Sequence, residues 1–126
     1  MSSAIETVRV LTLDEACPTL PLVDGDGTAV AIIWPGSGSA HRSMHHVALG
    51  AAARTVTQRH PGEAAYYVKS GDGLVVDPTD GTEQPLIEGS MVHVGPDSPY
   101  VFVAGSAGME ILGGPCPPDP ALYAHL

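Results

Sequence analysis

The sequence predicts a single all-β domain. Its 126 residues are enough to bury a hydrophobic core in one domain without disulfide bonds. Apolar residues make up 44% of the chain, and fifteen glycines and twelve prolines separate them into short runs. This composition is typical of many short strands joined by tight turns. The first 23 residues show no clear helical period, and the chain contains no internal repeat.

The charge balance argues against nucleic acid and membranes as partners. Five basic residues face fourteen acidic ones, and Lys69 is the only lysine. Such a chain lacks the basic surface that binds phosphate backbones or anionic lipids. Met1–Glu6 lacks the basic start and apolar core of a signal peptide, and no apolar run approaches the roughly 20 residues of a membrane helix. Cys17 and Cys116, with no CxxC spacing, are expected to be reduced thiols in a cytoplasmic protein.

The N-terminal third is expected to contain an arm, one strand and a loop. Residues 1–26 carry short apolar stretches split by acidic residues and proline, which predicts an edge strand plus an arm. A turn at 24–27 leads into residues 28–34, a continuous apolar run of strand length. The Pro, Gly and Ser residues of 35–40 predict a loop, which serves either as the rim or lid of a site or as a plain surface connection.

Residues 41–49 hold half of the histidines and are expected to form a strand with two different faces. Side chains alternate along a strand, and the bulky Val47 and Leu49 should face the core. This register places His45 inside and His46 outside, and a bulge would reverse the assignment. A buried His45 is either a hydrogen-bonded wall residue or a ligand, and the sequence leaves both open.

Residues 54–60 are expected to form the strand that carries the functional site. Gln58 and His60 point the same way along it, and after a Pro-Gly turn the return strand sets Tyr66 and Val68 on the same face. A polar pair beside an apolar wall and a phenol is how a small-ligand site in a β-barrel begins.

The remainder of the chain predicts further short strands. Gly71-Asp72-Gly73 is expected to be a turn, and residues 77–82 are expected to be a hairpin tip. Residues 109–112 are the last expected strand. The glycine- and proline-rich stretch 113–120 is expected to be an extended tail, because it suits neither a strand nor a helix.

Two stretches resemble the conserved motifs of the cupin family. The usual first motif is a Gly, five residues, His-x-His, three or four residues, Glu, six residues and Gly. Gln58 stands at the first His, His60 at the second, and Ala64 at the Glu. Residues 89–100 look like the second motif, with Tyr100 where the family has its fourth ligand, a histidine.

The resemblance implies a cupin β-sandwich or jelly-roll barrel over residues 27–114. It leaves residues 1–26 as an N-terminal arm and edge strand, and residues 115–126 as a proline-rich C-terminal tail. A homodimer is expected, because the arm of a cupin often packs on a partner subunit.

The family site usually holds one divalent metal through three His and one Glu, and of these His60 remains. One imidazole and one amide are weak ligands for zinc or iron. His45 could join Gln58 and His60 around zinc, iron, nickel or manganese, or a bulge could turn Glu63 into the place of Ala64. A site without metal is the third possibility.

The remaining residue types fit acid–base chemistry. His60 could accept a proton at neutral pH, and Tyr66 and Tyr100 could donate protons or hold an enolate oxygen, while Gln58 donates a hydrogen bond. We therefore expect a cyclase, isomerase or lyase that acts on a carbonyl-containing metabolite without redox chemistry. The alternatives are a cupin that binds a small molecule without turnover, and a metal-dependent dioxygenase that needs Glu63.

The ligand cavity is expected to have apolar and aromatic walls. The residues predicted to contact the ligand are Tyr66, Phe102, Trp34, Val47 and Val68.

Overall fold

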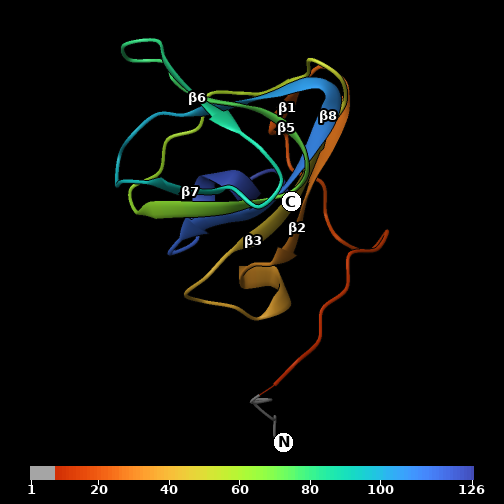
Figure 1. Cartoon of the computed structure of the whole chain (residues 1–126). Coiled ribbons are helices and arrows are strands. Elements are labelled where there is room, and N and C mark those ends of the chain that lie inside the picture. The colour runs from red at the N-terminus through yellow and green to blue at the C-terminus, as the bar shows by residue number, and fades with distance from the viewer. Residues whose placement is uncertain (1–7) are drawn as a thin grey trace, which may run out of the picture.

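The computed structural model describes residues 8–126, which fold into a curved, nearly closed sheet around one core (Figure 1). Strands supply almost all of the regular structure, and two short 3-10 helices follow β2 and β8. The elements in chain order are β1 (Val23–Asp24), β2 (Gly27–Ile33), η1 (Pro35–Ser37), β3 (Met44–Leu49), β4 (Arg54–Thr55), β5 (Glu63–Asp77), β6 (Thr82–Leu86), β7 (Met91–Val94), β8 (Val101–Cys116) and η2 (Pro120–Tyr123). The expected all-β class is confirmed.

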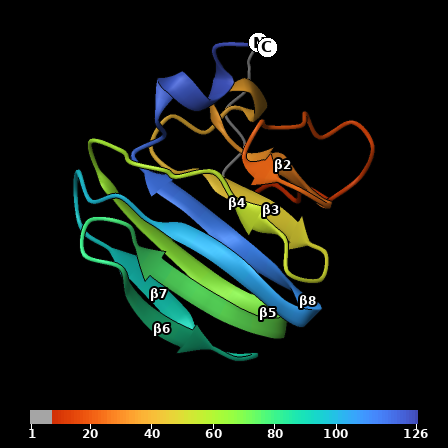
Figure 2. The same ribbon diagram turned by 90° about the horizontal axis from the view of Figure 1, so that it is seen from above.

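The two longest strands, β5 and β8, form the spine of the sheet. They pair antiparallel along most of their length, and β8 continues the path β1-β4-β8-β3-β2. β7 pairs with the first half of β5 and β6 with its second half, so both lie on the same side of the spine. Figure 2 shows the long, bent ribbons of β5 and β8 side by side, with β6 and β7 beyond β5.

The predicted turn at Gly71-Asp72-Gly73 is wrong, because β5 continues through it. Gly71 has a φ of +78°, and a Cβ there would lie 2.1 Å from the backbone oxygen of Gly108 on β8. The register between β5 and β8 shifts between Gly71 and Gly73. The glycines therefore bend a continuous strand against its neighbour instead of reversing the chain.

The prediction of an extended tail over residues 113–120 is also wrong for residues 113–116, which belong to β8. β8 runs to Cys116, where Ala64 pairs with Pro115 and Ala65 with Gly114. This pairing is possible because Gly113 lets the backbones of β5 and β8 approach closely. A Cβ on Gly113 would lie 2.0 Å from the backbone oxygen of Ala65. The chain then folds back as η2, so residues 115–126 are not an unattached tail.

The core lies between the two halves of the bent sheet. Alternate residues of β5 are buried in it, as are Phe102 and Ile111 of β8. Leu20 and Leu22, just before β1, also pack in this core, while much of the preceding arm is exposed.

Three further sequence predictions concern the chain ends, the thiols and the membrane. Residues 1–7 lie outside the described part, and with them Met1–Glu6, where no signal peptide was expected. Cys17 and Cys116 are free thiols. No helix among residues 8–126 has the length and apolar character required to cross a bilayer.

Candidate active site

The backbone before β5 brings Gln58 and His60 against the start of β8. The predicted strand 54–60 is regular only at β4, and beyond it Gln58 forms an isolated bridge with Tyr100. The backbone N–H of Gln58 donates to the backbone carbonyl of Tyr100 at 3.0 Å, and the backbone N–H of Tyr100 donates to the backbone carbonyl of Gln58 at 2.9 Å. Farther along, the Asp97 amide donates to the His60 carbonyl at 2.8 Å. These bonds direct the Gln58, His60 and Tyr100 side chains inward, where all three are buried.

Four of the buried side chains form a continuous chain of hydrogen bonds, which we call the relay: Asp119, His60, Tyr100 and Tyr66. His60 Nδ1 lies 2.7 Å from Asp119 Oδ2, and His60 Nε2 lies 2.9 Å from the Tyr100 hydroxyl. The Tyr100 and Tyr66 hydroxyl oxygens are 2.5 Å apart. Gln58 Oε1 lies 3.4 Å from the Tyr100 hydroxyl and is the weakest of these contacts.

The partners of His60 determine where its proton lies. An ionised carboxylate only accepts hydrogen bonds, so the proton of neutral His60 lies on Nδ1 and points at Asp119. Nε2 then carries a lone pair and accepts the hydroxyl hydrogen of Tyr100. The Tyr100 oxygen in turn accepts from the Tyr66 hydroxyl. In this state the Tyr100 hydrogen is not available to Gln58.

Both phenols of the relay stay protonated at physiological pH. Burial raises the pKa of Tyr100 above its ordinary value of 10.0, and the adjacent Tyr66 raises it further. Burial also raises the pKa of Tyr66, and the hydrogen bond with Tyr100 only partly offsets this. Tyr100 therefore rests as a neutral phenol and not as a phenolate.

Asp119 is the member of the relay that the sequence analysis missed. It is the N-cap of η2: Oδ1 accepts the Ala121 amide at 3.1 Å, while Oδ2 faces His60. An Asp immediately before a Pro is a helix-start signal, with the cap at Asp119 and the proline at the first helical position. That signal could have located η2, but it could not have shown that the short helix lies over His60.

His45 lies inside the sheet, in the register with Val47 and Leu49 that alternation predicts. Its Nε2 lies 2.7 Å from the hydroxyl of Tyr123, a residue of η2. Burial lowers the pKa of His45 to about 4, with the charge of His60 adding repulsion, so His45 is neutral at pH 7. His46 is on the opposite face, with Nε2 3.5 Å from Glu110.

The predicted metal ligands are not arranged to hold a divalent ion. Both ring nitrogens of His60 are already hydrogen-bonded, and Gln58 offers only a neutral amide. His45 Nδ1 is buried without a hydrogen-bond partner and lies next to Gly114, where a Cβ would be 3.3 Å from it, while His45 Nε2 is taken up by Tyr123. Among residues 8–126, no three His, Cys, Asp or Glu side chains converge as a metal site requires. The donor set therefore does not fit the family's metal.

No bulge turns Glu63 into the inward-facing place of Ala64. Ala64 faces the core, and Glu63 lies on the outer face with Oε1 2.5 Å from His93 Nε2. A bulge that reversed this order would break the pairing of Ala64 with Val94 on β7. The carboxylate that a dioxygenase would need at this position is thus absent from the inner face.

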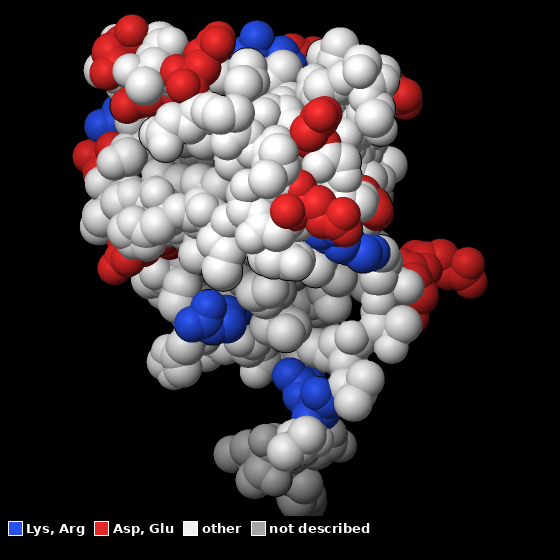
Figure 3. Space-filling model, in the orientation of Figure 1, with Lys and Arg blue, Asp and Glu red and all other residues white. Residues whose placement is uncertain are grey.

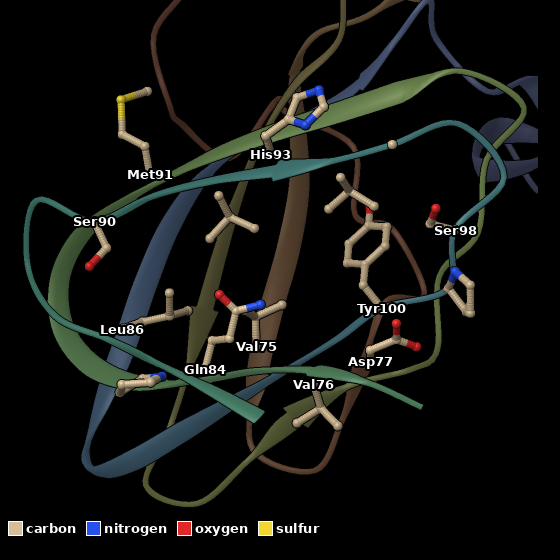
Figure 4. A pocket seen from close by; sticks show the side chains of 15 residues that line it. Val75, Val76, Asp77, Gln84, Leu86, Ser90, Met91, His93, Ser98 and Tyr100 are labelled. Carbon is tan, nitrogen blue, oxygen red and sulfur yellow. The ribbon is translucent and has the colours of Figure 1, made fainter. Parts of the chain in front are cut away.

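A pocket of about 420 Å³ opens between β6 and β7 and ends at Tyr100. Figure 4 shows Val75, Gln84 and Leu86 along one side of the hollow and the Tyr100 ring at its end. Tyr100 is the one member of the relay that lines this pocket, within the described part of the chain. The relay therefore lies behind Tyr100, away from the open space.

The five residues predicted to line a ligand cavity lie elsewhere. Tyr66, Phe102, Val47 and Val68 are packed in the core, with exposures of 2% or less. Trp34 stacks on Tyr123, with ring centroids 5.0 Å apart, and lines a different hollow beneath the N-terminal arm. The wall of the pocket at Tyr100 is instead built from β6, β7 and the second half of β5.

No protein-family model and no curated protein matches the chain. Solved structures do. The polyketide cyclase RemF from Streptomyces resistomycificus is 19% identical, with a TM-score of 0.64 over 100% of this chain and 94% of that one. A predicted oxalate decarboxylase from Thermotoga maritima is 18% identical, with a TM-score of 0.69 over 84% and 96%. An RmlC-like cupin from Shewanella frigidimarina is 16% identical, with a TM-score of 0.67 over 87% and 92%. The chain is therefore a small protein of the cupin fold.

Proposed function

We propose that this protein is an acid–base enzyme that moves a proton on a carbonyl compound, as a cyclase, isomerase or lyase without redox chemistry. The observation that carries the proposal is the relay, in which Asp119, His60 and Tyr100 are linked at 2.7 and 2.9 Å and Tyr100 lines the pocket. A polyketide cyclase of the same fold supports small-molecule chemistry in such a barrel.

The first half of the reaction is proton removal. A C–H bond next to the substrate carbonyl breaks, and its proton goes to the Tyr100 oxygen while the Tyr100 hydrogen moves to His60 Nε2. The electron pair of the C–H bond stays on the substrate as an enolate. His60 becomes an imidazolium, and Asp119 stabilises its charge through Nδ1–H.

The second half returns the proton. Once His60 is protonated, its Nε2–H donates to the Tyr100 oxygen, so the Tyr100 hydrogen is free to point into the pocket. Tyr100 then gives its hydrogen to another atom of the enolate, and Nε2 replaces it. The protonation state of His60 therefore switches Tyr100 between proton acceptor and proton donor.

The test is solvent deuterium exchange, which requires no knowledge of the natural substrate. The neutral bicyclic ketone 2-tetralone is incubated with the protein in D₂O, and loss of its α-proton signals is followed by NMR. We expect the wild-type protein to accelerate exchange, and Tyr100→Phe or His60→Ala to lower that acceleration by about 100-fold or more. Exchange that is no faster with protein than without it, for 2-tetralone and a panel of similar ketones, would rule the proposal out.

The second candidate is a binding module without turnover. It is favoured by the full set of hydrogen-bond partners that the Tyr100 hydroxyl already has. The Tyr100 hydroxyl already contacts His60, Tyr66 and Gln58, so the relay could serve only to satisfy buried polar groups. In that case His60→Ala weakens ketone binding but changes no exchange rate. The homodimer expected from the sequence remains a prediction under both candidates.

A further inference from the structure

The pocket at Tyr100 is lined by aliphatic side chains and by polar groups, most of which are uncharged. Val75, Leu86, Val92 and Val94 supply aliphatic surface. Gln84, Ser90, Ser98 and Tyr100 supply neutral hydrogen-bonding groups, and Asp77 and His93 are the titratable residues of the lining besides Tyr100. In Figure 4 the His93 and Met91 side chains point away from the hollow. A ligand inside thus meets aliphatic surface from the valines and Leu86 and several neutral hydrogen-bonding groups.

No lysine or arginine side chain lines this space. The sequence has only five Lys and Arg residues, all within the described part of the chain, and none lines the pocket. Arg59 is paired with Asp97 at 2.9 Å, and Lys69 lies 3.8 Å from Glu110. Most of the surface visible in Figure 3 is uncharged, and acidic groups outnumber basic ones there.

This charge distribution discriminates between ligands. A carboxylate or phosphate that entered the pocket would lose hydration without gaining a counter-charge, which is strongly unfavourable. Asp77 in the lining and the net charge of −9 add repulsion. A neutral ligand would lose little and would bury apolar surface against the valines and Leu86.

The volume of the pocket and its polar groups further restrict the chemical class of the ligand. At about 30 Å³ for each water, a pocket of about 420 Å³ has room for a small organic molecule and far exceeds the needs of a single ion. When His60 is protonated, the freed Tyr100 hydrogen at one end can be donated to a carbonyl oxygen, and the Gln84 side-chain amide on β6 can both donate and accept.

We infer that the pocket selects neutral carbonyl compounds and rejects anionic ones, with Tyr100 facing the carbonyl and Gln84 facing a second polar group. The inference rests on the proposed function, because it takes the pocket to be the substrate site of that enzyme. It adds the charge and the polarity of the substrate, which the relay alone does not specify.

The test compares two ligands of nearly equal shape, 2-acetylnaphthalene, a neutral ketone, and 2-naphthoate, its anionic counterpart. Binding is followed by amide NMR shifts, and the resonances of Val75, Gln84 and Val92 identify the pocket. We expect 2-acetylnaphthalene to bind at least about tenfold more tightly, a difference of about 1.4 kcal/mol. Gln84→Lys, which adds one positive charge inside the pocket, should reduce or reverse the preference. Glu83→Gln, which changes the net charge equally on the neighbouring residue outside the pocket lining, should not.

The outcome is separate from that of the exchange assay. Asp119→Asn should abolish the accelerated exchange through the relay, but it changes no residue of the pocket lining, so the ketone should still bind more tightly than the carboxylate. Equal binding of the two compounds, tighter binding of 2-naphthoate, or no binding of either at millimolar concentration would overturn the inference. A clear preference for the ketone without any accelerated exchange would support the inferred ligand class and would refute the proposed enzymatic function.

Discussion

The buried histidine of β3 makes the folded protein sensitive to acid, and the effect can be calculated. The pKa of His45 is lowered from 6.5 to about 4 in the folded state, first by burial and then by the charge of His60. Between these pH values the unfolded chain binds a proton that the folded protein does not, so acid favours unfolding. The stabilisation from a neutral His45 is fully present above pH 6.5 and is lost as the pH falls toward 4.

The difference between 6.5 and about 4, at 1.36 kcal/mol for each pKa unit, amounts to about 3 kcal/mol of unfolding free energy. The perturbation is His45→Gln, which keeps a polar group near the Tyr123 hydroxyl and removes the ionisation. Urea unfolding at pH 7, 6, 5 and 4 measures the free energy of wild type and variant. The carboxylates titrate in both proteins, so the difference between them isolates the histidine.

We expect the variant to be less stable than wild type at pH 7, and its disadvantage to shrink by about 3 kcal/mol on going to pH 4. His41→Gln, at an exposed position just before β3, is the matched control for the loss of an imidazole. Parallel stability curves for wild type and His45→Gln over this range would refute the reasoning.

Three further predictions concern stability. Phe102→Ala, at a side chain with 0% exposure that packs edge-on against Tyr66 and Tyr100, should lower the unfolding free energy by about 3–5 kcal/mol in urea; a loss below 1 kcal/mol would mean that the core is not packed as described. Gly113→Ala should destabilise by about 1–3 kcal/mol, because a Cβ would lie 2.0 Å from the Ala65 oxygen and the φ of +154° disfavours a side chain; an unchanged Tm would contradict the close approach of β5 and β8. Arg59→Gln removes an exposed ion pair with Asp97 and should leave the Tm unchanged; a clear drop would show that this pair orders the chain near His60.

Much of the site could be predicted because it depends on local periodicity. Alternation along a strand and the cupin-like spacing are short-range properties, and they place Gln58, His60 and Tyr100 on one inner face. The same reasoning puts His45 and His46 on opposite faces, as the register with β2 and β8 has them, but His46 is also buried, at 8% exposure, and does not lie outside as expected. The buried pattern of β5 from Ala64 to Val68 also follows from alternation.

What the sequence did not reveal depends on contacts between distant segments. Asp119 meets His60 across 59 residues, and no local pattern indicates where a short helix after β8 will lie. The continuation of β5 through Gly71 depends on the backbone of β8, which makes glycine necessary for a close approach and not for a turn. The pocket lining likewise depends on how β6 and β7 are placed along β5, a matter of sheet curvature.

The proton position on His60 tests the central claim most directly. Long-range ¹H–¹⁵N correlation spectra of selectively labelled protein distinguish the two ring nitrogens of the neutral imidazole. The relay requires a proton on Nδ1, donated to Asp119, and an unprotonated Nε2 that accepts from Tyr100. Neutral His60 that carries its proton on Nε2 would contradict the account, because Tyr100 could then not pass its hydrogen to the imidazole.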